Sequence, residues 1–138
     1  MEELLHYVWK HKLFTLKPLQ TTDGQPIEII DPGLANMHAG PDFFNAKIKI
    51  NDVTWVGNIE IHQQASDWFR HNHHLDPTYD SVILHVASDI DAVPTRSNGE
   101  IIPQMELHYP PYLLENYEGL IRADRYPAFI RIIPQLPS

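Results

Sequence analysis

Apolar residues occupy every second position in two consecutive segments, residues 43–50 and residues 53–62. A period of two is typical of β-strands that turn one face toward a core. The Asn-Asp pair at residues 51–52 separates the segments and suits a two-residue hairpin turn. We therefore expect an antiparallel hairpin in which Ile48 and Trp55 share one face.

The same reading of periodicity predicts the elements around this hairpin. Residues 2–12 carry an apolar stripe at helical spacing. The other predicted elements are a strand at 27–30, a helix at 67–74, strands at 80–88 and 100–109, and a helix at 112–122. Because a helical segment separates residues 53–62 from residues 81–87, we expect these two strands to be parallel neighbours.

These elements predict a single domain of the α/β (α+β) class with a mixed β-sheet. The order of its core is helix, three strands, helix and strand. We expect this core to occupy residues 1–110. Residues 111–138 would form a helical and proline-rich extension, whose end at 130–138 is more typical of a connector to a further region than of a recognition motif.

Composition excludes several classes of protein. The chain has 138 residues, of which 43% are hydrophobic, so it is not a disordered segment. It contains no cysteine, which excludes disulfides, thiolate zinc sites and a cysteine nucleophile. No apolar run approaches the ~20 residues of a membrane helix, and no signal peptide opens the chain. We expect a cytoplasmic protein without a membrane partner.

Charge and histidine content point in different directions. The formal charge is −8, from 18 acidic and 10 basic residues, and such a surface does not attract nucleic acid without specific contacts. The chain also has nine histidines. Five of them fall within 24 residues and locate the candidate chemistry: His62, His71, His73, His74 and His85.

A pair of carboxylates is the first candidate site. Glu60 and His62 lie two apart on a predicted strand and therefore on the same face, while Asp42 opens the preceding strand of the hairpin. Two carboxylates on neighbouring strands suit Mg²⁺ or Mn²⁺. A regular hairpin would place Asp42 and Glu60 on opposite faces. We therefore expect a β-bulge around residues 43–45, which brings the two acids together.

The histidines form the second candidate site. On the predicted helix, Asp67, His71 and His74 recur at one stripe, a donor set that suits Zn²⁺, Mn²⁺ or Fe²⁺ but matches no strict zinc motif. A solvated helix end is the alternative for these residues, and a hydrogen-bonded core histidine is the alternative for His85. Further candidate accessory residues are Asp76, near the same segment, and Asn36 and His38, on the loop before Asp42.

The acidic motif resembles that of a known superfamily. Pro41-Asp42 followed across a hairpin by Glu60-Ile61-His62 is similar to the PD-(D/E)XK nucleases. The resemblance implies a restriction-endonuclease-like core, metal binding by Asp42 and Glu60, and catalysis by these two residues and the residue at position 62. Histidine stands there in place of the expected lysine. A neutral His62 could act as a general base or bind the metal.

A longer stretch also resembles a large uncharacterised bacterial family, a domain of unknown function. The resemblance rests on Gly40-Pro41-Asp42-Phe43, residues 57–62, Asp67-Trp68, His71, His74, Asp76, Tyr79 and Leu84-His85-Val86. Members of that family are much longer. The resemblance implies that this chain is an N-terminal domain or a fragment.

Three hypotheses follow for function. The first is a Mg²⁺- or Mn²⁺-dependent phosphodiesterase or nuclease, with nucleic acid as a weakly bound partner of this acidic domain. The second is a degenerate nuclease fold that serves as a binding or structural module, favoured by His62 and by the net charge. The third is a histidine-based hydrolase that uses Zn²⁺ or another transition metal. Oligomeric state is not indicated by the sequence.

Overall fold

The computed structural model of the chain describes residues 2–14 and 18–125. The predicted connector at 130–138 lies outside the described residues. The helices and strands of the described residues are α1 (Glu2–Lys10), β1 (Ile27–Asp31), β2 (Leu34–Ala35), β3 (Phe43–Ile50), β4 (Val53–Gln64), α2 (Asp67–Arg70), the 3₁₀ turns η1 (His73–Leu75) and η2 (Pro77–Ser81), β5 (Val82–Asp89), β6 (Gln104–Glu106), α3 (Tyr112–Glu115) and α4 (Tyr117–Arg125).

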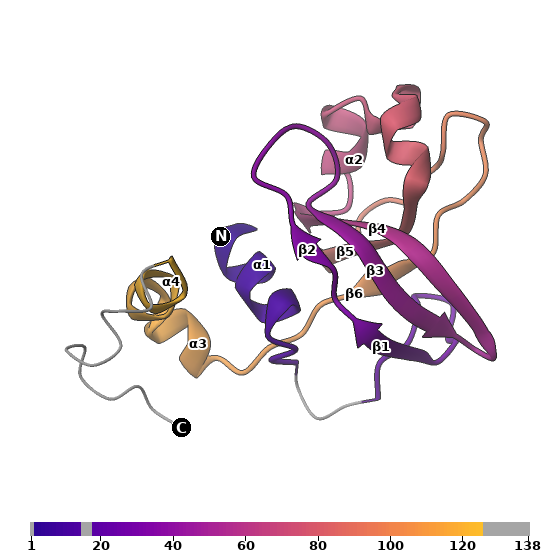
Figure 1. Cartoon of the computed structure of the whole chain (residues 1–138). Helices are drawn as coiled ribbons and strands as arrows, with labels where there is room; N and C mark the ends of the chain where they lie inside the picture. The colour runs from indigo at the N-terminus through magenta and orange to yellow at the C-terminus, as the bar shows by residue number, and fades with distance from the viewer. Residues whose placement is uncertain (1, 15–17, 126–138) are drawn as a thin grey trace.

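One mixed sheet organises the chain, in the order β1-β3-β4-β5-β6, with β2 paired to β3 (Figure 1). β1, β3 and β4 are antiparallel neighbours, whereas β5 runs parallel to β4 and β6 parallel to β5. The short helical segments between β4 and β5 make the crossover that this parallel pairing requires. The predicted α+β class, the hairpin and the parallel pair are all confirmed.

The two faces of the sheet differ in character. α1 covers one face with its apolar stripe, and the extension helices α3 and α4 lie beside α1 (Figure 1). The core on this face includes Leu4, Leu5, Val8 and Trp9 of α1, Ile48, Ile59, Ile61, Leu84 and Val86 of the sheet, and Leu113 and Leu120 of the extension. The opposite face has a smaller apolar cluster of Trp68, Val82 and Ile102. Buried polar side chains lie on this opposite face beside the smaller cluster, and this is where the candidate site lies.

The expected β-bulge is present in β3. Ala46 pairs with Gly57, but Phe43 pairs with Ile59, so that two residues of β3 lie opposite one residue of β4. Asn45 sits in the bulge with a positive φ of 57°, which asparagine tolerates better than most residues. The bulge shifts the register by one position. Asp42, the residue before β3, therefore faces Glu60.

The predicted helix at 67–74 is wrong. α2 ends at Arg70, and Asn72 adopts a left-handed conformation with φ of 60° before the 3₁₀ turn η1 begins. A left-handed residue redirects the chain, because it cannot continue a right-handed helix. The stripe of Asp67, His71 and His74 therefore does not exist as a helical face, and the segment presents His73 to the sheet instead.

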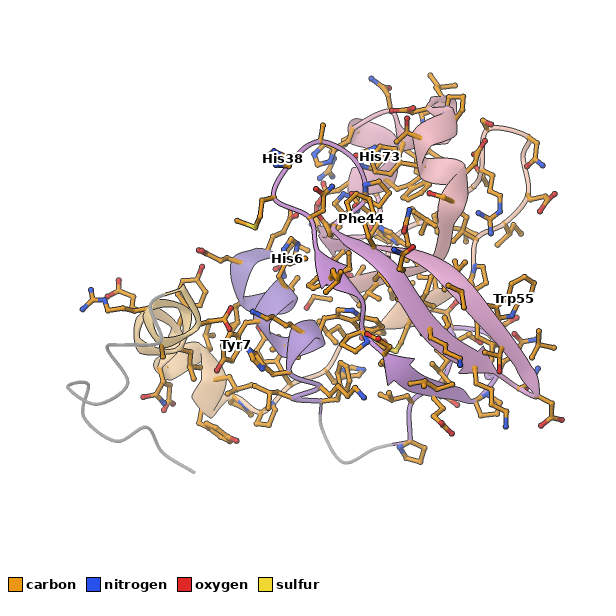
Figure 2. All side chains as sticks on the ribbon, viewed as in Figure 1. His6, Tyr7, His38, Phe44, Trp55 and His73 are labelled. Carbon is orange, nitrogen blue, oxygen red and sulfur yellow. The ribbon has the colours of Figure 1, made fainter. Side chains whose placement is uncertain are left out.

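Three other elements differ from the predicted bounds. Of the strand expected at 100–109, only residues 104–106 form a strand, and Ile101 makes an isolated bridge with Thr95. Prolines flank residues 104–106 and cannot donate to a ladder. The helix expected at 112–122 is interrupted at Asn116. Trp55 does pair with Ile48, but it is 48% exposed because the hairpin tip extends beyond the core (Figure 2).

Candidate metal centre

Asp42 and Glu60 are locked together across the bulge. The backbone N–H of Asp42 donates to Glu60 Oε1 at 3.1 Å, and the backbone N–H of Ile61 donates to Asp42 Oδ2 at 2.8 Å. Each acid is thus held by the strand that carries the other. The bulge converts a sequence separation of 18 residues into a reciprocal contact.

The second oxygen of Glu60 faces two imidazoles. His62 Nε2 lies 3.2 Å from Glu60 Oε2, and His73 Nε2 lies 2.9 Å from the same oxygen. All three side chains are buried, with exposures of 4% for Glu60, 1% for His62 and 7% for His73. Buried charged groups of this kind need partners, and here each supplies one for the other.

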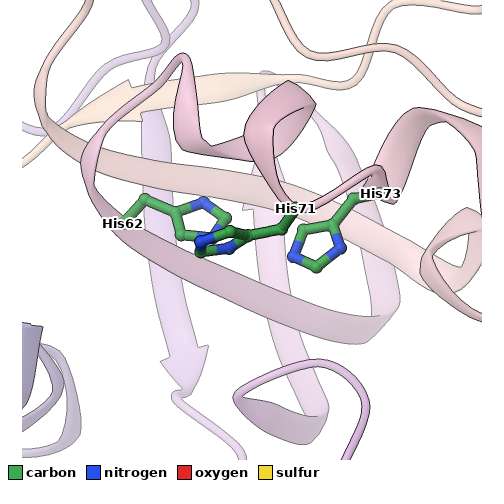
Figure 3. A group of neighbouring side chains, drawn as sticks. All are labelled: His62, His71 and His73. Carbon is green, nitrogen blue, oxygen red and sulfur yellow. The ribbon is translucent and has the colours of Figure 1, made fainter.

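A third imidazole completes a potential ligand set. One nitrogen from each of His62, His71 and His73 lies within 4.8 Å of the other two (Figure 3). β4 supplies His62, and the irregular segment after α2 supplies the other two. His71 is exposed while its two companions are buried, so the group opens to solvent on one side.

The pKa values of the two acids are shifted in opposite directions. Burial favours the neutral form of Glu60, but hydrogen bonds with His62 and His73 outweigh burial and lower its pKa to about 2. Burial raises the pKa of Asp42, and the neighbouring charge of Glu60 raises it further against the opposing effect of His6. Glu60 is therefore the weaker base of the two carboxylates, and Asp42 is the stronger base.

Histidines balance this negative charge. Burial opposes protonation of His62, but the hydrogen bond and charge of Glu60 prevail and raise its pKa. His6 of α1 places Nε2 3.4 Å from Asp42 Oδ2, and its pKa is also raised, by Asp42 against the effect of burial. Without a metal ion, the carboxylates thus favour the protonated form of both histidines.

A chain of buried polar groups extends behind His62. His62 Nδ1 lies 2.8 Å from His85 Nε2, and His85 Nδ1 lies 2.7 Å from Gln104 Oε1. The amide of Gln104 then donates from Nε2 to the carbonyl of Ala92 at 2.9 Å. Burial of His85 lowers its pKa to about 4, so this ring is neutral near pH 7.

Aromatic rings fix the position of His73. Tyr79 stacks on its imidazole with ring centroids 3.6 Å apart, and Trp68 meets it edge-on at 5.2 Å. Trp68 also contacts the ring of His85 at 5.3 Å. Trp68 and Tyr79 thus belong to the smaller apolar cluster and also pack directly on histidines of the candidate site.

Several predicted accessory residues make local contacts in their own segments instead. The ring of His74 packs against Phe69, and Asp76 caps η2 by accepting from Thr78 N at 2.9 Å. Asn36 braces the loop before β3 by donating to the carbonyls of Ala39 and Pro41. His38 is exposed on that loop (Figure 2).

The sequence predicted no ligand or catalytic role for two residues of the cluster, His73 and His6. His73 belongs to the histidine-rich segment, but helical spacing predicts a shared face for His71 and His74 and not for His73. The left-handed conformation of Asn72 ends that spacing and presents His73 to the sheet instead. His6 carried no signal in the sequence, since its position beside Asp42 depends on how α1 lies on the sheet.

The fold and cluster define an α+β domain with a carboxylate–histidine site on its central strands. Over residues 2–138 the chain matches a family described as "Protein of unknown function (DUF2851)", and it belongs to that family. The search of curated proteins gave no match. The search of solved structures also gave none. Among the described residues, no helix is long and apolar enough to cross a bilayer.

Proposed function

We propose that this domain is a metal-dependent hydrolase of phosphodiesters, with a transition-metal ion held by Glu60 and the imidazoles of His62, His71 and His73. The observation that carries the proposal is the convergence of His62 Nε2 and His73 Nε2 on Glu60 Oε2, at 3.2 Å and 2.9 Å. These three atoms all carry lone pairs when each histidine is neutral and has its hydrogen on Nδ1. A cation among them would replace the protons that now satisfy them.

The donor set favours Zn²⁺ or Mn²⁺ over Mg²⁺. Mg²⁺ prefers oxygen ligands and retains several waters, whereas imidazole nitrogen suits Zn²⁺ and other first-row transition metals. The cluster offers three imidazoles for one well-placed carboxylate. An ion bound there would supply Lewis acidity toward a phosphoryl oxygen and lower the pKa of a water ligand.

The Asp42–His6 pair is the proposed proton acceptor. Asp42 keeps one oxygen on the Ile61 amide and faces His6 with the same oxygen, at the edge of the metal cluster. The raised pKa of Asp42 makes it a stronger base than an ordinary aspartate. This assignment moves the base role away from His62, which its contacts with Glu60 and His85 already engage.

Two features support a phosphodiester substrate. The antiparallel β1-β3-β4 meander, followed by a crossover to parallel β5, agrees with the element order that the nuclease resemblance implies. Lys47 and Lys49 also lie on the same face of the sheet as Glu60. Lys47 pairs with Val56, which is an even number of residues from Glu60 along β4 and therefore on the same face. The proposed partner is a nucleic acid in the cytoplasm, bound weakly by this acidic domain.

A degenerate module is the second candidate. The motif lysine is replaced by His62, which is 1% exposed and hydrogen-bonded on both ring nitrogens, so it cannot extend toward a substrate as a lysine would. In that case the cluster would stabilise the domain or a partner complex. Metal binding without hydrolysis would favour this candidate.

Neighbouring histidines provide a matched test. Zn²⁺ and Mn²⁺ binding would be measured by calorimetry for the unsubstituted chain, His73→Ala and His74→Ala. We expect the His73 variant to lose binding and the His74 variant to retain it, because only His73 faces Glu60. Hydrolysis of bis(p-nitrophenyl) phosphate in the presence of each metal then tests activity. Absence of binding by the unsubstituted chain would overturn the metal centre.

A further inference from the structure

The donor and acceptor atoms of the buried hydrogen bonds behind His62 can be assigned from chemistry alone. A carbonyl oxygen only accepts hydrogen bonds, so the group of Gln104 that faces Ala92 O must be the amide nitrogen. The amide oxygen of Gln104 therefore faces His85 Nδ1, at 2.7 Å. The opposite orientation of Gln104 would set two oxygens against each other and leave both unpaired in a buried site.

This orientation fixes the tautomer of His85. Its Nδ1 must carry a hydrogen, because Gln104 Oε1 can only accept. His85 is fully buried, and its two ring nitrogens face only the amide of Gln104 and the ring of His62, so no anion compensates a second ring hydrogen and its Nε2 is an acceptor. The atom 2.8 Å away, His62 Nδ1, must then be a donor.

We propose that His85 and Gln104 are positioning residues that keep a hydrogen on His62 Nδ1, so that Nε2 is the nitrogen available to a cation in the Glu60 cluster. Nε2 is the nitrogen that lies 3.2 Å from Glu60 Oε2, the oxygen that His73 also contacts. A histidine that binds a metal through one nitrogen commonly donates from the other to a fixed acceptor, and the acceptor sets ring orientation and ligand basicity.

The inference deepens the proposed function and rests on it for its purpose, but the tautomer itself can be observed without metal. In the alternative arrangement, His85 would donate from Nε2 and His62 would carry its hydrogen on Nε2, where it would block a ligand. The sequence of donors from Ala92 to His62 thus decides whether the cluster can accept a cation at this position.

Nitrogen NMR of the metal-free chain is the direct test. A long-range ¹⁵N–¹H correlation spectrum distinguishes a protonated ring nitrogen from an unprotonated one. We expect His62 Nδ1 to carry a hydrogen, whether or not Nε2 also carries one toward Glu60. A His62 with no hydrogen on Nδ1 overturns the inference, and this spectrum needs no substitution.

A variant pair tests the part played by Gln104. Gln104→Met keeps the length of the side chain but removes the acceptor, and Gln64→Met is the control on β4, because the Gln64 amide contacts Arg70 outside the chain of buried groups. In Gln104→Met we expect His62 to shift toward the Nε2–H tautomer and Zn²⁺ affinity to fall about 10–100-fold. The control should change neither.

The two proposals fail in different ways. If the unsubstituted chain binds no metal but His62 is the Nδ1–H tautomer, the proposed function fails and the hydrogen-bond assignment stands. If the chain binds Zn²⁺ and Gln104→Met retains both the tautomer and the affinity, the positioning role is wrong and the metal centre stands.

Discussion

Glu60 is the residue on which the candidate site depends. Its two oxygens make different contacts: Oε1 accepts from the Asp42 amide, and Oε2 meets His62 and His73. The first contact ties the carboxylate to the hairpin, and the second connects it to the irregular segment after α2. One side chain thus joins the two parts of the chain that carry chemistry.

Replacement of Glu60 by Gln tests this position. We expect Glu60→Gln to lose Zn²⁺ and Mn²⁺ binding, because an amide is a poor ligand and places a donor against the histidines. The metal-free variant should also be less stable by about 1–3 kcal/mol, since a buried charge-assisted hydrogen bond is lost. Calorimetry and urea denaturation measure the two effects. Undiminished metal binding would move the site away from Glu60.

At the scale of elements, the bulge in β3 is the feature that makes the site. Without it, the hairpin register that pairs Ala46 with Gly57 would continue and separate Asp42 from Glu60. Asn45 absorbs the extra residue in a left-handed conformation, with its N–H 3.2 Å from Asn58 Oδ1. The bulge is therefore both a strand irregularity and the positioning device for an acid.

Substitution at Asn45 separates these roles. Asn45→Val should destabilise the chain by about 1–3 kcal/mol, because a β-branched residue is strained at positive φ. It should also weaken Mn²⁺ binding, as Asp42 moves when the bulge is disfavoured. Asn45→Gly is the control and should keep both properties, since glycine adopts this conformation without strain. Normal Mn²⁺ affinity in the valine variant would show that the bulge does not position the site.

The contact between α4 and α1 is a second feature at this scale. Asp124 of α4 lies 3.1 Å from Lys10 Nζ and 2.8 Å from His11 Nε2. Burial would raise the pKa of Asp124, but the bonds from His11 and Lys10 outweigh burial and lower it below 3.8. A lowered pKa in the folded state stabilises the fold above the ordinary value, and this contribution is lost as pH falls through the folded value.

Asp124→Asn should therefore reduce stability at neutral pH by only about 0.2–1 kcal/mol, because the pair is partly exposed. The difference between the variant and the unsubstituted chain should disappear at a pH below the folded pKa of Asp124. Thermal unfolding monitored by circular dichroism from neutral pH down to about pH 2 gives the comparison. An undiminished difference at the acid end would exclude Asp124 as the source.

The elements that the sequence predicts well are those set by local periodicity. The period of two across residues 43–62 predicts the hairpin and, through its register, the bulge that Asp42 needs. The segment after α2 is predicted poorly, because its path depends on Asn72, whose left-handed conformation no periodicity reveals. The contact between His6 and Asp42 depends on the packing of α1 on the sheet and has no local signal at all.

At the scale of the whole molecule, charge limits the choice of partners. A net charge of −8 repels a polyanion, and the lysines on the site face are few. A cation at the cluster would neutralise part of the local negative charge. Any affinity for nucleic acid should therefore depend on metal and decline steeply with salt.

A gel-shift assay tests this dependence. We expect weak retardation of single- or double-stranded DNA with Mn²⁺ at low salt, and none without Mn²⁺ or at about 0.15 M salt, where surface attraction is screened. Glu60→Gln should behave with Mn²⁺ as the unsubstituted chain does without it. Tight binding without metal would show that a surface other than the cluster recognises nucleic acid.

The central claim is that Glu60, His62 and His73 hold a metal ion, and anomalous X-ray scattering from crystals of the Zn²⁺-loaded chain tests it most directly. The account predicts a peak of anomalous density in contact with a Glu60 carboxylate oxygen and with Nε2 of His62 and of His73. A crystal saturated with Zn²⁺ that shows no peak at these three atoms, or shows zinc only at exposed histidines such as His38, would contradict it.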